Sequence, residues 1–312
     1  MLTVLLATRN GRRTLPGVLE AYSRVEAPQG GFRLVIVDNA STDGTPDLLA
    51  PFLGRLPLTL LSETTPGKNV ALNRGLSAVE GDLVVFTDDD AFPRPDLLVR
   101  LRAAADAHPE FSIFGGVVVP RWEQPPPEWL RWVPQGPVFT LTPPTMVEGP
   151  AKPSDVFGPN MAIRAAVFAT GHRFDAAIGP RGTAYAMGSE AEFLRRLMRQ
   201  GHAAWHVTGA VVEHFIRASQ MDAAWIRGRA VRFGRGQFRL AQPEAAEPLV
   251  SWLGVPRYLF RGLGEQALRM LGACLRRDAQ GLFLARWEFN RLWGAAVEAR
   301  IMRNETKRWG TL

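Results

Sequence analysis

The stretch Asp82-Leu-Val-Val-Phe-Thr-Asp-Asp-Asp90 decides the fold. Its apolar run, Leu83 to Phe86, is partly β-branched, which is typical of a strand buried inside a parallel sheet. The three carboxylates that follow, Asp88, Asp89 and Asp90, repel one another unless a cation binds there. Open α/β sheets bind ligands at the carboxyl ends of their strands, and Mg²⁺ prefers one or two carboxylates together with phosphate oxygens. The stretch therefore predicts a metal and phosphate site, and the alternative is a solvated turn in which Asp90 caps a helix.

Strand-like and helix-like segments alternate around this stretch through residue 120. Strands are expected at residues 3–8, 32–37, 58–62, 83–86 and 112–119, and helices are expected to end near residue 25 and to cover residues 45–53, 68–79 and 95–108. This rhythm predicts an α/β fold with a doubly wound, mainly parallel sheet flanked by helices. Neither a Gly-x-Gly-x-x-Gly motif nor a Walker loop follows the first strand, which argues against dinucleotide-binding and P-loop sites.

Residues 121–153 are rich in proline, which forbids long regular structure there. Trp122, Trp129 and Trp132 are set among the prolines. These side chains either hold a loop on the core or form an aromatic platform for a sugar or a lipid-linked ligand, and the sequence leaves both interpretations open.

Residues 188–201 are predicted to form an amphipathic helix, because apolar side chains recur on one face and a glycine ends the pattern. Ser189 and Glu192 have the spacing of a capping box, in which each side chain binds a backbone N–H at the start of the helix. The cap gives Glu192 a structural role. The cap does not require Glu190, so this carboxylate is available for another role.

Composition indicates an intracellular globular enzyme. The 312 residues are 46% apolar, enough for one large domain with additions. A single cysteine, Cys274, excludes an internal disulfide framework and is typical of a reducing compartment. Residues 1–8 are expected to form the first strand rather than a signal peptide, and no apolar run is long enough to span a membrane. We expect a cytoplasmic protein.

The net positive charge lies in the last third of the chain. Residues 215–312 carry 17 Arg and Lys against 8 Asp and Glu, a net +9, whereas residues 1–214 carry 20 against 22 and so −2; the whole chain has +7. Apolar and aromatic side chains recur at helical spacing between the arginines, which predicts a basic helical extension. It either packs on the catalytic domain or lies on an anionic membrane surface, at the inner face of the cell membrane. Nucleic acid is not expected, because no groove-reading motif accompanies the charge.

Several motifs occur together in a fixed order along residues 1–215. They are Val37-Asp38 with Ser41 and Asp43, Gly67-Lys-Asn-Val-Ala-Leu-Asn73, Asp88-Asp-Asp90, Asn160-Met-Ala-Ile-Arg164, Gly188-Ser-Glu190 and Val212-Glu-His214. This ordered set resembles the inverting glycosyltransferases of family 2, which have the GT-A fold. The resemblance implies a nucleotide-sugar-binding half at residues 1–120, an acceptor-binding and catalytic-base half at 121–214, and the basic extension at 215–312.

The resemblance implies where a UDP-, GDP- or dTDP-linked sugar donor would bind. Asp38 would accept hydrogen bonds from the nucleobase, a charge-assisted contact that needs a fixed carboxylate. Thr8 and Arg9 would line the base and the ribose. Asp88 would contact the ribose, and Asp89 would serve one of its two neighbours.

Two further residues of the resemblance would lie near the diphosphate or the ribose. They are Lys68 and Asn73, at the start and the middle of the helix predicted after residue 67. For Lys68 the alternative is an ordinary surface lysine whose aliphatic stem covers apolar surface.

The implied cofactor is Mg²⁺ or Mn²⁺, held by Asp90 between the protein and the two phosphates of the donor. His214, which follows a predicted strand at residues 207–212, would complete the metal or diphosphate site. Its alternative role is a structural histidine with satisfied hydrogen bonds.

Glu190 is the expected catalytic base, with Asp175 and Glu192 as alternatives. A carboxylate must take the proton of an acceptor hydroxyl while the anomeric carbon is attacked. The family commonly has Glu-Asp with the aspartate as base, so Ser189-Glu190 departs from its pattern by one methylene group.

The implied activity is metal-dependent, inverting sugar transfer to a hydroxyl acceptor such as a glycan, a lipid-linked saccharide or another cell-envelope molecule. Two other functions stay open on the sequence: a nucleotidyltransferase, which also sets carboxylates at strand ends, and a non-catalytic sugar-binding or scaffold protein of the same fold.

Overall fold

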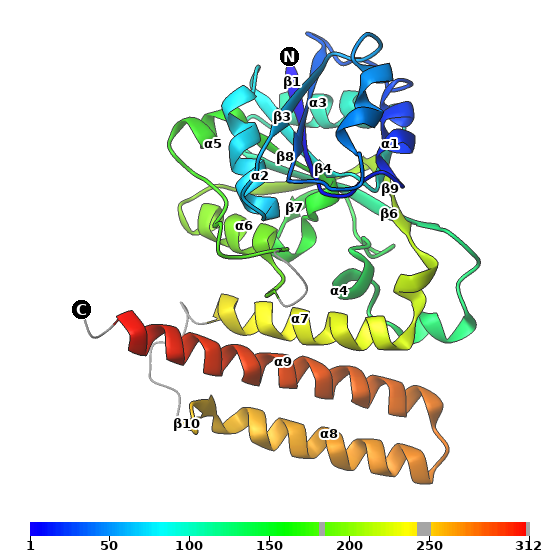
Figure 1. Ribbon diagram of the computed structural model, residues 1–312, viewed down its shortest axis with the longest axis vertical. Helices are drawn as coiled ribbons and strands as arrows, with labels where there is room; N and C mark the ends of the chain where they lie inside the picture. The colour runs from blue at the N-terminus through cyan, green and yellow to red at the C-terminus, as the bar shows by residue number, and fades with distance from the viewer. Residues whose placement is uncertain (181–184, 242–250, 310–312) are drawn as a thin grey trace. The chain divides into compact units, whose positions relative to one another are not determined.

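The computed structural model describes residues 1–180, 185–241 and 251–309 (Figure 1). The chain forms two compact units. The first comprises Met1–Arg121, Phe139–Ala177 and Ser189–Ile216, and the second comprises Trp122–Val138, Ile178–Gly188 and Arg217–Leu312.

A mixed sheet forms the centre of the first unit. In the described residues it has nine strands in the order β3-β2-β1-β4-β8-β6-β9-β5, with β7 paired to β9. The strands are β1 (Leu2–Thr8), β2 (Phe32–Asp38), β3 (Leu58–Ser62), β4 (Leu83–Asp88), β5 (Ala91–Pro93), β6 (Ile113–Trp122), β7 (Gly149–Ala151), β8 (Met161–Arg164) and β9 (Ala204–Ile216). β3, β2, β1 and β4 run parallel, whereas β8 pairs antiparallel with β4 and β6, and β5 and β7 pair antiparallel with β9. The predicted α/β class is confirmed.

Helices flank this sheet. They are α1 (Leu15–Tyr22), α2 (Lys68–Gly75), α3 (Leu97–Ala107), α5 (Ala165–Ala169) and α6 (Ser189–Arg199), with short 3-10 turns η2 (Leu76–Ala78), η4 (Pro153–Asp155) and η5 (Gly158–Asn160). The helix expected at residues 45–53 is instead the 3-10 helix η1 (Pro46–Phe52), which contains Pro51 and so lacks one backbone donor. Apolar residues of the central strands and of α2 and α6 form a buried core, among them Leu5, Phe86 and Phe193.

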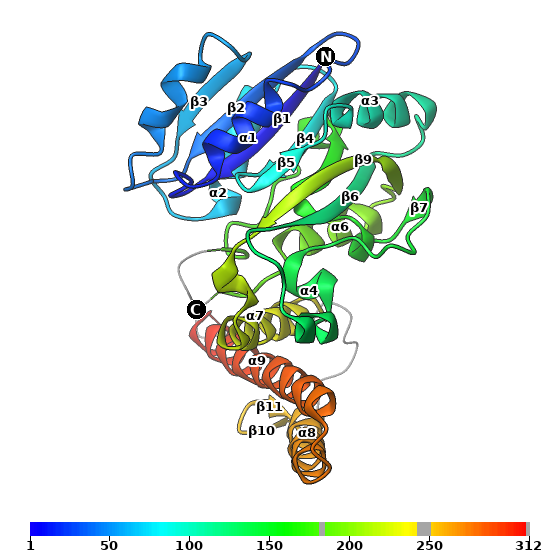
Figure 2. The same cartoon turned by 90° about the vertical axis from the view of Figure 1, so that its right-hand side faces the viewer.

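The second unit is mainly helical. It contains α7 (Ala223–Ala241), α8 (Arg257–Leu275) and α9 (Ala279–Trp309), the short strands β10 (Ser251–Trp252) and β11 (Val255–Pro256), the 3-10 helices η3 (Glu128–Trp132) and η6 (Ala218–Met221), and most of α4 (Gln135–Phe139). In Figures 1 and 2, α9 runs between α7 and α8. Among the described residues, no helix combines the length and apolarity needed to cross a membrane.

Two features explain the close packing of α7 on α9. A Cβ atom at Gly234 would clash with the backbone carbonyl of Arg291, so only glycine allows this approach. Glu298 of α9 is fully buried, and its two carboxylate oxygens bind Arg235 at 2.8 Å and Arg239 at 2.6 Å. Both arginines come from α7, four residues apart and therefore on one face of the helix.

Trp129 and Trp132 pack on Phe283 of α9, with ring centroids 5.6 Å and 6.3 Å apart. These contacts hold the segment Trp122–Val138 on the helices of the second unit. They give Trp129 and Trp132 a packing role, which was one of the two interpretations left open by the sequence.

Candidate active site

Three predicted site residues meet in the first unit although they lie far apart in the sequence. The ammonium group of Lys68, at the start of α2, lies 2.6 Å from Asp88 Oδ1 at the end of β4 and 2.9 Å from Glu190 Oε1 in α6. About a fifth of each side chain is exposed: 19%, 21% and 23%. Gly158 lies against the same carboxylate, because a Cβ there would come within 2.7 Å of Glu190 Oε1.

This cluster shifts the pKa values of all three groups. Burial lowers the pKa of Lys68, but the charges of Asp88 and Glu190 outweigh it and raise the pKa above its usual value. Burial raises the pKa of Glu190, yet the Lys68 charge and hydrogen bonds from Ser189 and Lys68 bring it down from 4.5 to about 2. For Asp88 burial dominates and, with the nearby carboxylates, raises the pKa despite Lys68. At neutral pH Lys68 is therefore a cation that holds Glu190 as a carboxylate.

Asn39 positions Lys68, and the sequence did not single it out. This buried side chain donates hydrogen bonds to the carbonyls of Glu63 and Thr65 and accepts one from Gly67 N at 2.8 Å. Gly67 has a φ of 147°, which favours glycine, and Lys68 begins α2 directly after it. The sequence feature that could have identified Asn39 is its position immediately after the last residue of a buried strand.

Asp90 and His214 form the second part of the site. His214 Nδ1 lies 2.7 Å from the carbonyl of Phe139, and Nε2 lies 3.5 Å from Asp90 Oδ1. Burial lowers the pKa of His214, but the negative charge of Asp90 outweighs it and raises the pKa. A histidine whose Nδ1–H is held by a carbonyl presents Nε2 to its partner, as metal-bound histidines do.

These two residues fit a divalent ion only in company with other ligands. The described part of the chain contains no group of three or more His, Cys, Asp or Glu side chains arranged to hold a metal. Mg²⁺ commonly takes one or two protein carboxylates and completes its shell with substrate phosphates and water. The Asp90 and His214 pair suits such a shared site, and not a metal cage made by the protein alone.

At the carboxyl end of β2, Asp38 is a buried acceptor that lacks a full set of partners. Its side chain is 7% exposed, and Oδ1 has no hydrogen-bond partner in the described structure. On the neighbouring strand β1, Thr8 donates a 2.5 Å hydrogen bond to Asp89. Arg9 follows Thr8 and is exposed. Polar groups from β1, β2 and β4 therefore converge at one edge of the sheet, because these strands are parallel.

Two loops beside Asp38 are held together by side chains. Asn10 has a φ of 58°, and its backbone N–H donates to Ser41 Oγ while its side-chain oxygen accepts from Thr42 N at 2.8 Å. The backbone N–H of Arg12 donates to the carboxylate of Asp43. The loops after β1 and β2 thus form one fixed surface next to the buried Asp38 oxygen.

The amide of Asn73 binds the backbone of Phe174. Its Nδ2 donates to the Phe174 carbonyl at 2.8 Å and its Oδ1 accepts from the Phe174 N–H at 2.9 Å. Four residues earlier, Asn69 donates to the carbonyl of Asp175. One face of α2 therefore anchors the chain at residues 174–175, and Asn73 is engaged there and not with the carboxylates around Lys68.

The two alternative bases make other contacts. Asp175 is exposed and accepts a hydrogen bond from Ala177 N. Glu192 binds Arg196 at 2.9 Å, and the hydroxyl of Ser189 donates to Glu190 Oε2. α6 begins at Ser189, so this serine is the first helical residue and not the N-cap that the sequence predicted.

Comparison with known proteins agrees with this architecture. A PGL/p-HBAD biosynthesis glycosyltransferase of Mycobacterium bovis (strain BCG / Pasteur 1173P2) is 33% identical over 124 residues, covering 38% of this chain and 47% of the relative. The match thus spans about half the length of that relative.

Two solved structures share the fold. The mannosyltransferase PcManGT from Pyrobaculum calidifontis, in complex with GDP-Man and Mn²⁺, superposes with a TM-score of 0.65 at 20% identity, covering 96% of this chain and 87% of that one. S. aureus TarS 1-349 in complex with UDP-GlcNAc gives 0.53 at 15% identity, covering 99% and 91%.

A family model provides the assignment. The model described as Glycosyl transferase family 2 matches residues 3–171, which is more than half of the chain and includes most of β1, all of β2 and β4, Lys68 and the three aspartates. The protein therefore belongs to glycosyl transferase family 2.

Proposed function

We propose that this protein is a metal-dependent, inverting glycosyltransferase that moves a sugar from a nucleotide-diphosphate donor to a hydroxyl acceptor. The observation that carries the proposal is the cluster of Lys68, Asp88 and Glu190 beside the pair Asp90 and His214. It combines a cation for a diphosphate, two groups for a divalent ion and a carboxylate base. The donors named for the two solved structures are GDP-Man and UDP-GlcNAc, so the nucleobase of the donor stays open between UDP-, GDP- and dTDP-linked sugars.

The nucleoside end of the donor is assigned to the edge of β1 and β2. The unpartnered Oδ1 of Asp38 is buried and would accept a hydrogen bond from a base N–H, which repays the cost of its burial. Thr8 and Arg9 lie beside it, and Asp88 and Asp89 follow at the end of β4. Asn73 is left out of this set, because its amide is engaged with Phe174.

Asp90 and His214 would hold Mg²⁺ or Mn²⁺. A divalent ion bound there would stabilise the charge that develops on the leaving diphosphate. His214 is already oriented for this by its hydrogen bond to the Phe139 carbonyl.

Glu190 would act as base only after Lys68 moves. A carboxylate with a pKa of about 2 is a weak proton acceptor at neutral pH, because general bases work best with a pKa near the operating pH. The diphosphate of a bound donor competes for the Lys68 ammonium. Once Lys68 turns to the phosphates, its charge and hydrogen bond no longer lower the pKa of Glu190.

The transfer step forms one bond at the anomeric carbon and breaks another. Glu190 takes the proton of the acceptor hydroxyl as that oxygen forms a bond to the anomeric carbon. The bond between this carbon and the phosphate oxygen breaks, and its electron pair leaves with the nucleoside diphosphate. Attack from the face opposite the leaving group inverts the anomeric configuration.

Thermal unfolding with UDP, GDP or dTDP, with and without Mn²⁺, tests the donor and metal assignments. We expect one nucleotide to raise the melting temperature more with Mn²⁺ than without, because a ligand that binds only the folded state stabilises it. Asp90→Ala should keep its fold and lose the Mn²⁺-dependent part of the gain. An unchanged Mn²⁺-dependent gain in Asp90→Ala would show that Asp90 does not hold the metal.

We also propose that the exposed face of α8 binds an anionic membrane. Leu268 and Leu275 of α8 are 71% and 78% exposed, Trp252 at the start of the unit's short hairpin is 62% exposed, and the Arg261 side chain is 83% exposed. Exposed apolar and aromatic side chains among arginines suit the boundary of an anionic bilayer.

Flotation with liposomes tests the membrane proposal. We expect recovery with anionic vesicles that falls as salt rises, and weaker recovery for the combined variant Arg257→Gln, Arg261→Gln and Arg269→Gln. Equal, negligible recovery with neutral and anionic vesicles would rule out a membrane role for α8.

A further inference from the structure

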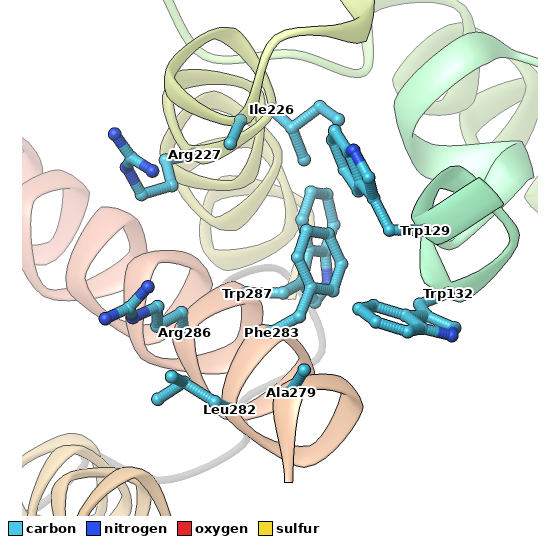
Figure 3. A pocket seen from close by; sticks show the side chains of 10 residues that line it. Trp129, Trp132, Ile226, Arg227, Ala279, Leu282, Phe283, Arg286 and Trp287 are labelled. Atoms are coloured by element: carbon cyan, nitrogen blue, oxygen red, sulfur yellow. The ribbon is translucent and has the colours of Figure 1, made fainter. Parts of the chain in front are cut away.

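The second unit contains a pocket with a volume of about 260 Å³ (Figure 3). Aromatic rings dominate its wall: Trp129 and Trp132 come from η3, and Phe283 and Trp287 come from α9. Ile226 of α7 adds an aliphatic surface. A wall of this composition favours an apolar ligand, because rings and aliphatic groups gain by removal of apolar surface from water.

Two arginines give the pocket a charge. Arg227 of α7 and Arg286 of α9 both line it, and Figure 3 shows them away from Trp132, on the other side of the view. Both side chains are exposed, and within the described residues neither guanidinium has an ion-pair partner. No acidic residue belongs to the lining. The pocket thus has an apolar interior, and its lining contains two cations and no carboxylate.

We propose that this pocket binds a single-chain lipid phosphate. Part of the hydrocarbon chain would lie among Trp129, Phe283 and Trp287, and the phosphate would bind Arg227 and Arg286. Guanidinium groups bind phosphate through paired N–H donors, which gives charge and geometry together. The small volume admits one chain segment, which distinguishes this site from the exposed face of α8. The inference does not depend on the proposed transfer reaction, since every residue it uses lies in the second unit.

Calorimetry on the intact protein with three probes separates the contributions of the hydrocarbon chain and the phosphate to binding. Decyl phosphate carries both the hydrocarbon chain and the anion, 1-decanol carries the hydrocarbon chain alone, and inorganic phosphate carries the anion alone. At concentrations below micelle formation we expect saturable binding of decyl phosphate with one molecule per chain, and binding at least about tenfold weaker for the other two probes. Decanol binding as tight as decyl phosphate binding, or no binding of decyl phosphate, would overturn the proposal.

Variants then locate the binding site. Arg227→Gln combined with Arg286→Gln should weaken decyl phosphate binding by about tenfold or more, because charge-assisted hydrogen bonds are lost. The matched control, Arg269→Gln combined with Arg300→Gln, removes the same charge from exposed positions of α8 and α9 outside the pocket and should bind as the wild type does. Equal weakening by both pairs would indicate general attraction to a basic protein and would overturn the site.

A third variant blocks the pocket without removing a packed side chain. Ala223, an exposed lining residue at the start of α7, can be enlarged in Ala223→Phe. We expect this variant to lose decyl phosphate binding while its melting temperature and its response to nucleoside diphosphate with Mn²⁺ stay as in the wild type. Unchanged decyl phosphate binding in Ala223→Phe would place the ligand elsewhere. The nucleotide response reports separately on the proposed function.

Discussion

Replacing Lys68 by methionine tests the electrostatics of the candidate site. Lys68→Met keeps the length of the side chain but leaves Asp88 and Glu190 without the cation that lies 2.6 Å and 2.9 Å from them. Removing one partner of a largely buried ion pair is strongly destabilising, because the other charge stays buried without compensation. We expect the variant to fold and to be less stable than the wild type.

The size of the expected loss of stability in Lys68→Met follows from the pKa of Glu190. Its fall from 4.5 to about 2 in the folded protein corresponds to ~3 kcal/mol, at 1.36 kcal/mol for each tenfold change in proton affinity. The folded-state pKa lies below the usual value, so ionised Glu190 stabilises the protein above pH 4.5, and this contribution is lost as the pH falls toward about 2. The deficit of Lys68→Met should be full at pH 7 and should shrink below pH 4.5.

Urea unfolding at pH 7 and at pH 3, followed by circular dichroism, measures both quantities. Arg74→Met is the matched control, because Arg74 is an exposed cation of the same helix and its loss should change stability by no more than about 0.5 kcal/mol. A Lys68→Met protein as stable at pH 7 as Arg74→Met would refute the reasoning, and so would a deficit that does not depend on pH.

Two further substitutions test contacts inside each unit. Asn39→Ala removes three hydrogen bonds to the backbone of residues 63–67, so we expect it to lower the free energy of unfolding by about 2–3 kcal/mol and to weaken nucleotide binding. Urea unfolding measures the first effect and calorimetry the second. Nucleotide binding of wild-type strength would show that Asn39 does not position the site. Glu298→Ala leaves Arg235 and Arg239 without their carboxylate inside the second unit, so a loss of about 3–5 kcal/mol is expected in the unfolding of that unit, and a loss below about 1 kcal/mol would contradict the role assigned to this buried group.

Local sequence pattern predicts the parallel part of the sheet better than the antiparallel part. The apolar runs before Asp38 and before Asp88 both indicate strands of a parallel sheet, and in such a sheet the carboxyl ends of strands meet at one edge. The structure has this arrangement in β2, β1 and β4. The antiparallel pairing of β8 with β4 has no comparable local signal, because it joins segments that are distant in the sequence, with Leu83 opposite Arg164.

Contacts between distant residues limited the prediction of the site. The sequence singled out Lys68 and Glu190, but not the hydrogen bond between them, since it joins residues 122 positions apart through the packing of α2 and α6. Asn73 matched the family motif, and its partner Phe174 lies 101 positions away. The spacing of Ser189 and Glu192 did not indicate that Glu192 also binds Arg196.

Product analysis of a nucleotide-sugar reaction tests the central claim most directly. Purified protein is incubated with Mn²⁺, a hydroxyl acceptor and UDP-, GDP- or dTDP-linked sugars, and the released nucleotide is separated by chromatography. We predict release of nucleoside diphosphate from one class of donor, with inverted configuration in the product. The rate should fall by roughly 10²–10⁴ in Glu190→Gln. It should stay near the wild-type value in Glu192→Gln, whose side chain binds Arg196. Retained configuration in the product, release of pyrophosphate from a nucleoside triphosphate and a sugar phosphate in a parallel reaction, or wild-type turnover by Glu190→Gln would contradict the account.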